Sequence, residues 1–98
     1  MKAIFLPAAQ QELDQTIKFY EQQLTGLGVI FRNEIFEAID FICLYPEGYQ
    51  LITKHTRKCS LRKFPYLVLY GIVDNTIIIS AVAHQHRHPR SYLHRKPQ

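Results

Sequence analysis

Two apolar runs in the second half of the chain are separated by only two residues. Residues 66–73 read YLVLYGIV and residues 76–83 read TIIISAVA, with Asp74 and Asn75 between them. Asp and Asn tolerate the positive φ angles that a two-residue hairpin turn requires, so we predict a β-hairpin. Its second strand is apolar on both faces at residues 77–79, which is typical of a central strand covered by helices.

The first half has the periodicity of two helices. Residues 2–6 are a short apolar segment that Pro7 ends, which predicts a strand. Apolar residues then recur at helical spacing from residue 8 to the TGLG segment at residues 25–28, and again from about residue 29 to residue 45. Because the link is so short, the two helices should form an antiparallel hairpin.

These elements predict a single α+β domain over residues 1–98. The predicted order is strand, helix, helix and three strands, with the helical hairpin at about residues 8–45 packed on a mainly antiparallel sheet at about residues 51–84. The signal in residues 51–58 is ambiguous between strand and loop. A basic tail over residues 84–98 completes the chain.

Positive charge is concentrated in the second half. Residues 1–50 carry three basic and seven acidic side chains, a net charge of −4. Residues 51–98 carry nine basic side chains and one acidic one, a net charge of +8, together with all five histidines. Such a dipolar molecule should present one face to an anionic partner, either nucleic acid or an acidic protein segment.

Composition excludes several classes of protein. An apolar fraction of 47% supports a core and argues against disorder. The apolar runs fall far short of the roughly 20 residues of a membrane span. No signal peptide is visible, so we expect a cytoplasmic protein with no membrane partner. Cys43 and Cys59 lack the spacing of a metal or redox motif, so we expect free thiols.

Cationic and titratable side chains cluster before the hairpin. They are Lys54, His55, Arg57, Lys58, Arg62 and Lys63. On a continuous strand, Arg57 and Lys63 would lie on one face and Lys58 and Arg62 on the other. The cluster is typical of a surface that binds phosphates or an acidic segment of a partner. The alternative is a solvated edge strand whose lysines prevent aggregation.

Histidines alternate after the hairpin, in the segment HQHRH at residues 84–88. Alternating imidazoles can bind a metal, but no carboxylate or thiolate is nearby and Arg87 would repel a cation, so we expect no metal and no cofactor. A metal-independent ribonuclease needs a base, an acid and cations around the phosphorus. The residues that contain those parts are His84, His86, Arg87, Arg57 and Tyr92. A plain binding surface is the alternative.

Other polar and aromatic residues receive simpler interpretations. Helical spacing predicts that the carboxylates of both helices are solvated: Glu12, Asp14, Glu21, Glu34, Glu37 and Asp40. Phe64 and Tyr70 should pack in the core. Tyr92, which lies in a polar segment, is instead a functional candidate.

The whole pattern resembles the RelE/ParE superfamily of bacterial type II toxins over nearly the entire chain. The matching features in the helices are Pro7-Ala8-Ala9, Glu12-Leu13, Gly28, Phe31 and Pro46. Those in the second half are Arg57, Phe64-Pro65-Tyr66, Tyr70, Ala83-His84, Arg87, Pro89 and Arg95. The segment over residues 64–89 is the most specific, and it resembles the ParE-like branch more than the RelE-like one.

This resemblance implies a toxin that a cognate antitoxin neutralises in a hetero-oligomer. ParE-like members poison DNA gyrase by trapping the cleaved complex and are not enzymes. RelE-like members are endoribonucleases that cut mRNA on the ribosome. A non-toxic binding module of the same fold is a third reading.

The resemblance also implies roles for residues of the second half. The catalytic candidates, relevant only to a ribonuclease, are His84, Arg87, Arg57 and Tyr92. The candidates for binding a target or the antitoxin are Lys54, Arg57, Lys58, Arg62, Lys63, His86, Arg90 and Arg95.

Overall fold

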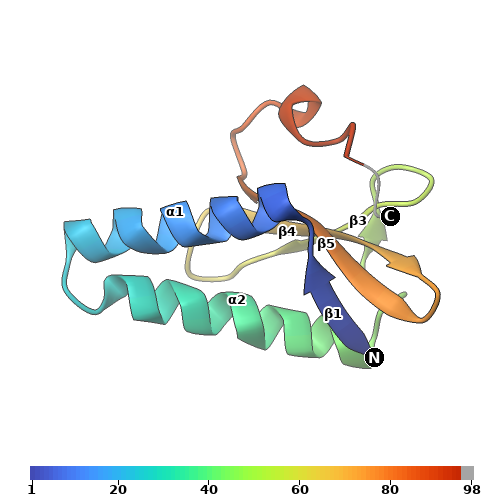
Figure 1. Ribbon diagram of the computed structural model, residues 1–98, viewed down its shortest axis with the longest axis horizontal. Coiled ribbons are helices and arrows are strands. Elements are labelled where there is room, and N and C mark those ends of the chain that lie inside the picture. The colour runs from blue at the N-terminus through green and yellow to red at the C-terminus, as the bar shows by residue number, and fades with distance from the viewer. Residues whose placement is uncertain (96–98) are drawn as a thin grey trace.

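The computed structural model describes residues 1–95 of the chain. Two helices, α1 (Pro7–Gln23) and α2 (Leu27–Leu44), form an antiparallel hairpin on one face of a five-stranded sheet (Figure 1). The strands are β1 (Lys2–Phe5), β2 (Gln50–Leu51), β3 (Arg57–Ser60), β4 (Tyr66–Val73) and β5 (Thr76–His84), in the spatial order β1-β5-β4-β3-β2. The predicted α+β class is confirmed, with a strand, a helical hairpin and then a mainly antiparallel sheet. Four strands rather than three follow α2, because the short strand β2 precedes β3.

The predicted hairpin is β4 and β5. Asp74 and Asn75 adopt positive φ angles of 48° and 61°, as a two-residue hairpin turn requires. The strands pair antiparallel from Val73 with Thr76 to Tyr66 with His84, with one irregularity in the β4 register. Only β1 is parallel to its neighbour, β5, because the helical hairpin carries the chain across the sheet between them.

The turn between the helices depends on glycine and on a carboxylate. Gly26 has a φ of 91°, a conformation that favours glycine. Gly28 lies inside α2, where a Cβ would meet the Ile17 carbonyl oxygen at 2.6 Å, so only glycine lets the helices approach so closely. The Glu21 carboxylate accepts the N–H groups of Gly26 at 2.8 Å and Gly28 at 3.1 Å. Glu21 therefore caps the start of α2. Its helical spacing had predicted a solvated side chain, and that prediction is wrong.

Aromatic rings form much of the core between the helices and the sheet. Phe31 is fully buried and packs edge-on against Phe64 and Tyr66, with ring centroids 5.1 and 5.3 Å away. Tyr70 is also fully buried, and its hydroxyl donates to the Pro46 carbonyl at 2.6 Å. Burial raises the pKa of Tyr70 to about 12. The predicted core positions of Phe64 and Tyr70 are confirmed.

A second core covers the other face of the sheet. Its buried members are Leu69, Ala81, Ala83 and Tyr92. The C-terminal segment, residues 85–95, turns through a short 3-10 helix, η1 (Pro89–Ser91), and packs Tyr92 against the sheet. In Figure 1 this segment is drawn in red, away from α2. The doubly apolar strand is thus covered by helices on one face and by this segment on the other.

The structure places Tyr92 differently from what its polar sequence neighbours suggested. Residues 85–95 pack on the sheet, and Tyr92 is only 5% exposed, although its polar neighbours suggested an accessible ring. The physical reason is that β5 needs an apolar cover on both faces, and Tyr92 and Leu93 supply it. The remaining tail residues, 96–98, lie outside the described residues. Within residues 1–95, no helix has the length and hydropathy to cross a membrane.

The strand before the β4–β5 hairpin is shorter than the predicted alternation of its cationic side chains requires. Strand β3 ends at Ser60, and Arg62 and Lys63 lie in the following loop. The Glu34 carboxylate accepts both their backbone N–H groups, at 2.8 and 3.2 Å. The predicted face assignment therefore fails for Arg62 and Lys63, and Glu34 is a second carboxylate whose solvated reading is wrong.

Candidate functional site

A carboxylate on α1 links the C-terminal segment to the helical hairpin. The Glu12 carboxylate accepts a hydrogen bond from the guanidinium of Arg87. It also accepts two from the guanidinium of Arg95, with N···O distances of 2.8 and 3.1 Å. It also accepts the Val82 N–H at 3.0 Å. The Glu12 side chain is only 13% exposed. Its predicted role as a solvated helix carboxylate is wrong, because α1 crosses β5 at this point and the C-terminal segment closes over it.

The two arginines of this network differ in solvent exposure. Arg95 also donates to the Ser80 carbonyl at 3.1 Å, and its side chain is 15% exposed. Arg87 donates through Nε to the Ser91 hydroxyl at 2.6 Å and is 34% exposed. Two guanidinium groups share one carboxylate, so the network keeps a net charge of +1. That charge is accessible at Arg87 rather than at Arg95.

The environment of Glu12 lowers its pKa. Burial acts to raise the pKa, but the hydrogen bonds from Arg95, Arg87 and the Val82 N–H, with the Arg95 charge, outweigh it and hold the pKa below the ordinary value of 4.5. A group whose pKa is depressed on folding stabilises the fold above its unfolded pKa. That contribution is lost as the pH falls through the folded pKa.

We therefore expect acid sensitivity that depends on Glu12. The free energy of unfolding of the wild type should fall more steeply below pH 4.5 than that of Glu12→Gln, whose amide does not titrate. Urea unfolding of both proteins between neutral pH and about pH 3 measures this difference. Parallel curves over that range would contradict the assignment of the network to this carboxyl group.

Arg57 lies apart from the other ribonuclease candidates, whereas Arg87, Tyr92 and the neighbouring His86 line one groove. Arg57 pairs with Tyr70 and His84 pairs with Tyr66, on opposite sides of β4 and four residues apart along it. Four residues of strand span roughly 13 Å. The Arg57 guanidinium donates to the carbonyls of Tyr49 at 2.6 Å and Glu47 at 3.2 Å, so it fastens the chain between α2 and β2.

The histidines after β5 are organised by local contacts. The His84 ring lies edge-on to Tyr66, with centroids 5.2 Å apart, and its Nδ1 accepts the His86 N–H at 3.1 Å. His88 accepts the Arg90 N–H and caps η1. Within residues 1–95, no group of three or more His, Cys, Asp or Glu side chains is placed to share a metal ion.

The other binding candidates lie apart from one another. Lys54 is exposed in the loop between β2 and β3, and Lys63 is exposed in the loop before β4. Arg90 is exposed on η1. Lys58 is half-buried on the sheet face that carries the C-terminal segment, opposite the face of Arg57 and Cys59. The cationic residues thus occupy several surfaces rather than one.

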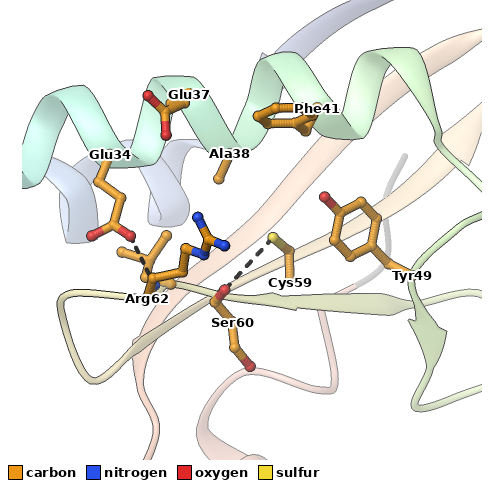
Figure 2. Close-up of a pocket in the computed structure, with 9 residues that line it drawn as sticks. Glu34, Glu37, Ala38, Phe41, Tyr49, Cys59, Ser60 and Arg62 are labelled. Atoms are coloured by element: carbon orange, nitrogen blue, oxygen red, sulfur yellow. Dashed lines mark hydrogen bonds between the residues drawn. The ribbon is translucent and has the colours of Figure 1, made fainter.

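A cleft opens between α2 and β3, and it encloses about 360 Å³ (Figure 2). Phe41 and Ala38 of α2 face it from one side, and Cys59, Leu61 and Arg62 from the other. Burial raises the pKa of the Cys59 thiol, so this group stays protonated and acts as a small apolar wall. We refer to this feature as the α2–β3 cleft.

Exposed apolar side chains continue from this cleft along the end of α2. Phe41 is 51% exposed, and Leu44, Tyr45 and Leu51 are between 49% and 68% exposed. This surface was not predicted from the sequence. The available signal was that α2 is apolar around its whole circumference near its end, which is more than one buried face needs.

The architecture has a solved counterpart. A structure described as the chromosomal ParDE TA system from P. aeruginosa matches this fold with a TM-score of 0.74 at 15% sequence identity. The match covers 86% of this chain and 95% of that chain. At this identity the likeness shows the fold, and so it defines the class: a small α+β domain like one found in a toxin–antitoxin system.

A family model then identifies the family. The model for the ParE toxin of the type II toxin–antitoxin system, parDE, matches residues 3–89, which is nearly the whole domain. The chain therefore belongs to the ParE toxin family. This confirms the resemblance to the ParE-like branch of the RelE/ParE superfamily. No curated protein matches the sequence significantly.

Proposed function

We propose that this chain inhibits DNA gyrase and is neutralised by a cognate antitoxin. The observation that carries the proposal is the match of the ParE toxin family over residues 3–89. The ParE-like branch is the one whose members trap the cleaved gyrase complex. In this role the protein acts by binding and needs no catalytic residues of its own.

The placement of the ribonuclease candidates also supports a binding role. Arg57 is engaged with backbone carbonyls, and Arg87 is engaged with Glu12 and Ser91. Tyr92 is buried in the second core. Acid–base catalysis needs its groups within hydrogen-bond reach of one reacting site. Because Arg57 lies apart and Arg87 and Tyr92 are engaged in the fold, these contacts favour a non-enzymatic mechanism.

Pulse-labelling of cells that express the chain without an antitoxin tests the target. We expect DNA synthesis to stop before protein synthesis, because gyrase inhibition blocks replication first. Purified protein should then inhibit supercoiling by gyrase in a purified system. Translation stopping first, with supercoiling unaffected by excess protein, would assign the chain to mRNA cleavage instead.

His84→Ala separates the two mechanisms and should disturb the fold less than Arg87→Ala. Its ring contacts Tyr66 and His86 at the surface, whereas Arg87 is part of the Glu12 network and its removal also perturbs folding. We expect His84→Ala to arrest growth as the wild type does. Loss of toxicity in a folded His84→Ala protein would point to catalysis by this residue.

For the antitoxin we propose the α2–β3 cleft as the docking site. Exposed apolar side chains border the cleft, and apolar surface of this kind is buried when a partner binds. The outer edge of the short strand β2 lies at the end of the sheet, where an extended segment of a partner can add as a further strand. The Phe41→Asp experiment below tests this site.

A further inference from the structure

A groove on the sheet face away from the helices is left unused by the proposed docking site. It encloses about 550 Å³, which lies within the range of small-ligand sites. Lys58 of β3 and Leu67 of β4 line one side. Residues 85–89 and Tyr92 of the C-terminal segment line the other. We refer to it as the cationic groove.

The charge around this groove has one sign. Lys58 and Arg87 contribute cations, and the exposed imidazole rings of His86 and His88 lie beside them. Among the described residues that line the groove, none is acidic. The nearest carboxylate in the bonding pattern is Glu12, and it is shared by two arginines. The groove is therefore positively charged even though Arg87 is ion-paired.

The walls of the groove supply flat and apolar surfaces next to these charges. Leu67, Tyr92 and Leu93 belong to the second core, so their outer atoms form a rigid apolar floor. The rings of His86 and His88 are exposed at the rim. Grooves that bind single-stranded nucleic acid combine cations along the backbone with planar side chains on which bases stack.

We propose that the cationic groove binds the phosphodiester backbone of a nucleic acid strand. This inference rests on the proposed function, which makes DNA in the gyrase complex the nucleic acid concerned. The toxin would then contact the enzyme and its DNA together.

An acidic protein segment fits this groove less well. The strands that line it, β3 and β4, each have a neighbour on both sides, so no strand edge is free at Lys58 or Leu67 to receive a peptide backbone. Charged side chains and rings are the recognition groups that remain. They suit phosphates and bases better than a strand that adds by backbone hydrogen bonds.

Charge reversal at Lys58 tests the groove. The binding of a dye-labelled single-stranded DNA of about 12 nucleotides is measured by fluorescence anisotropy. We expect Lys58→Glu to raise the dissociation constant at least about tenfold, because it removes a phosphate contact and adds a repulsive charge. Lys18→Glu is the matched control: it makes the same change on an exposed residue of α1, on the opposite face of the sheet. It should change the constant by less than about twofold.

A neutral substitution at the same position tests the groove in case Lys58→Glu does not fold. Lys58→Gln removes the charge but keeps an unbranched polar side chain at this half-buried β3 position. Its binding should remain measurable, with a salt dependence reduced by about 0.7 in the slope of log K against log salt, as for one lost phosphate contact on a single strand. An unchanged slope in a folded Lys58→Gln protein overturns the proposal.

Further outcomes decide between ligands. If Lys58→Glu and Lys18→Glu weaken oligonucleotide binding equally, the groove is not the binding site. The absence of oligonucleotide binding by the wild type also overturns the proposal. Displacement of the DNA by an acidic peptide of equal net charge at lower concentration would assign the groove to a protein segment. The gyrase assay is independent of these results. Wild-type protein that binds the oligonucleotide yet leaves supercoiling unaffected would refute the proposed function and not the groove.

Discussion

Replacing Glu12 with alanine is expected to lower the free energy of unfolding by about 3 kcal/mol. The substitution leaves two arginines without their carboxylate and removes the acceptor of the Val82 N–H. Removing one partner of a buried ion pair typically costs about 3–5 kcal/mol, and we take the lower end because Arg87 is 34% exposed. For a domain of this size, the melting temperature should fall by more than about 10 °C.

Glu37→Ala is the matched control for this loss. Glu37 is an exposed glutamate on the other helix, and such surface substitutions usually change stability by less than about 0.5 kcal/mol. Thermal and urea unfolding of the two variants gives the comparison. Hydrogen exchange should also show faster exchange in residues 85–95 of Glu12→Ala, because the C-terminal segment loses its tether. Equal stability of the two variants would mean that the network contributes nothing net.

The parts of the fold that were predictable are those that neighbouring residues determine. The hairpin of β4 and β5 follows from two apolar runs and a turn at Asp74 and Asn75, and its strands begin and end within one residue of the prediction. The helical hairpin follows from periodicity and a glycine-containing link. Gly28 was predicted to lie in that link, but it lies in α2. Glycine is needed at this position because the Ile17 carbonyl of α1 approaches closely, and not because of the turn.

The roles of the carboxylates were not predictable from local pattern. Glu12 contacts arginines 75 and 83 residues away in the sequence. Helical spacing describes only which residues share a helix face, and it is silent on what covers that face. Glu21 and Glu34 likewise bind backbone N–H groups of later segments. Tyr92 was misjudged for the same reason: its neighbours in sequence are polar, but its neighbours in space are Leu69, Ala81 and Ala83.

The charge asymmetry of the sequence does not tell which individual cations are available to a partner. The guanidinium groups of Arg95 and Arg57 donate to acceptors within the protein, so they add little positive charge that a partner could contact. Lys58 keeps an accessible charge beside the shared guanidinium of Arg87. A net charge is thus a property of the chain, whereas the charge available for binding depends on which cations already have acceptors.

Phe41→Asp is expected to weaken antitoxin binding by a factor of about 30 or more. Aromatic side chains at the centre of an interface contribute about 2–4 kcal/mol when removed, and an aspartate would in addition carry a charge into a desolvated cleft. Phe41 lies over the α2–β3 cleft with half of its surface exposed, so the free toxin should fold normally. Under the proposed function, the variant should therefore arrest growth as the wild type does, and co-expression of a cognate antitoxin should no longer restore growth.

Phe19→Asp makes the comparison specific to the cleft. Phe19 and Phe41 are the same residue type, both are 51% exposed, and they lie on different helices of one hairpin. Phe19 does not line the cleft, so its replacement should change the antitoxin dissociation constant by less than about threefold, within the range of a near-neutral contact. Calorimetric titration of the antitoxin into each variant gives the two constants. If Phe19→Asp loses binding while Phe41→Asp retains it, the antitoxin docks on the other side of the hairpin. If both variants keep binding, the α2–β3 cleft is not the docking site.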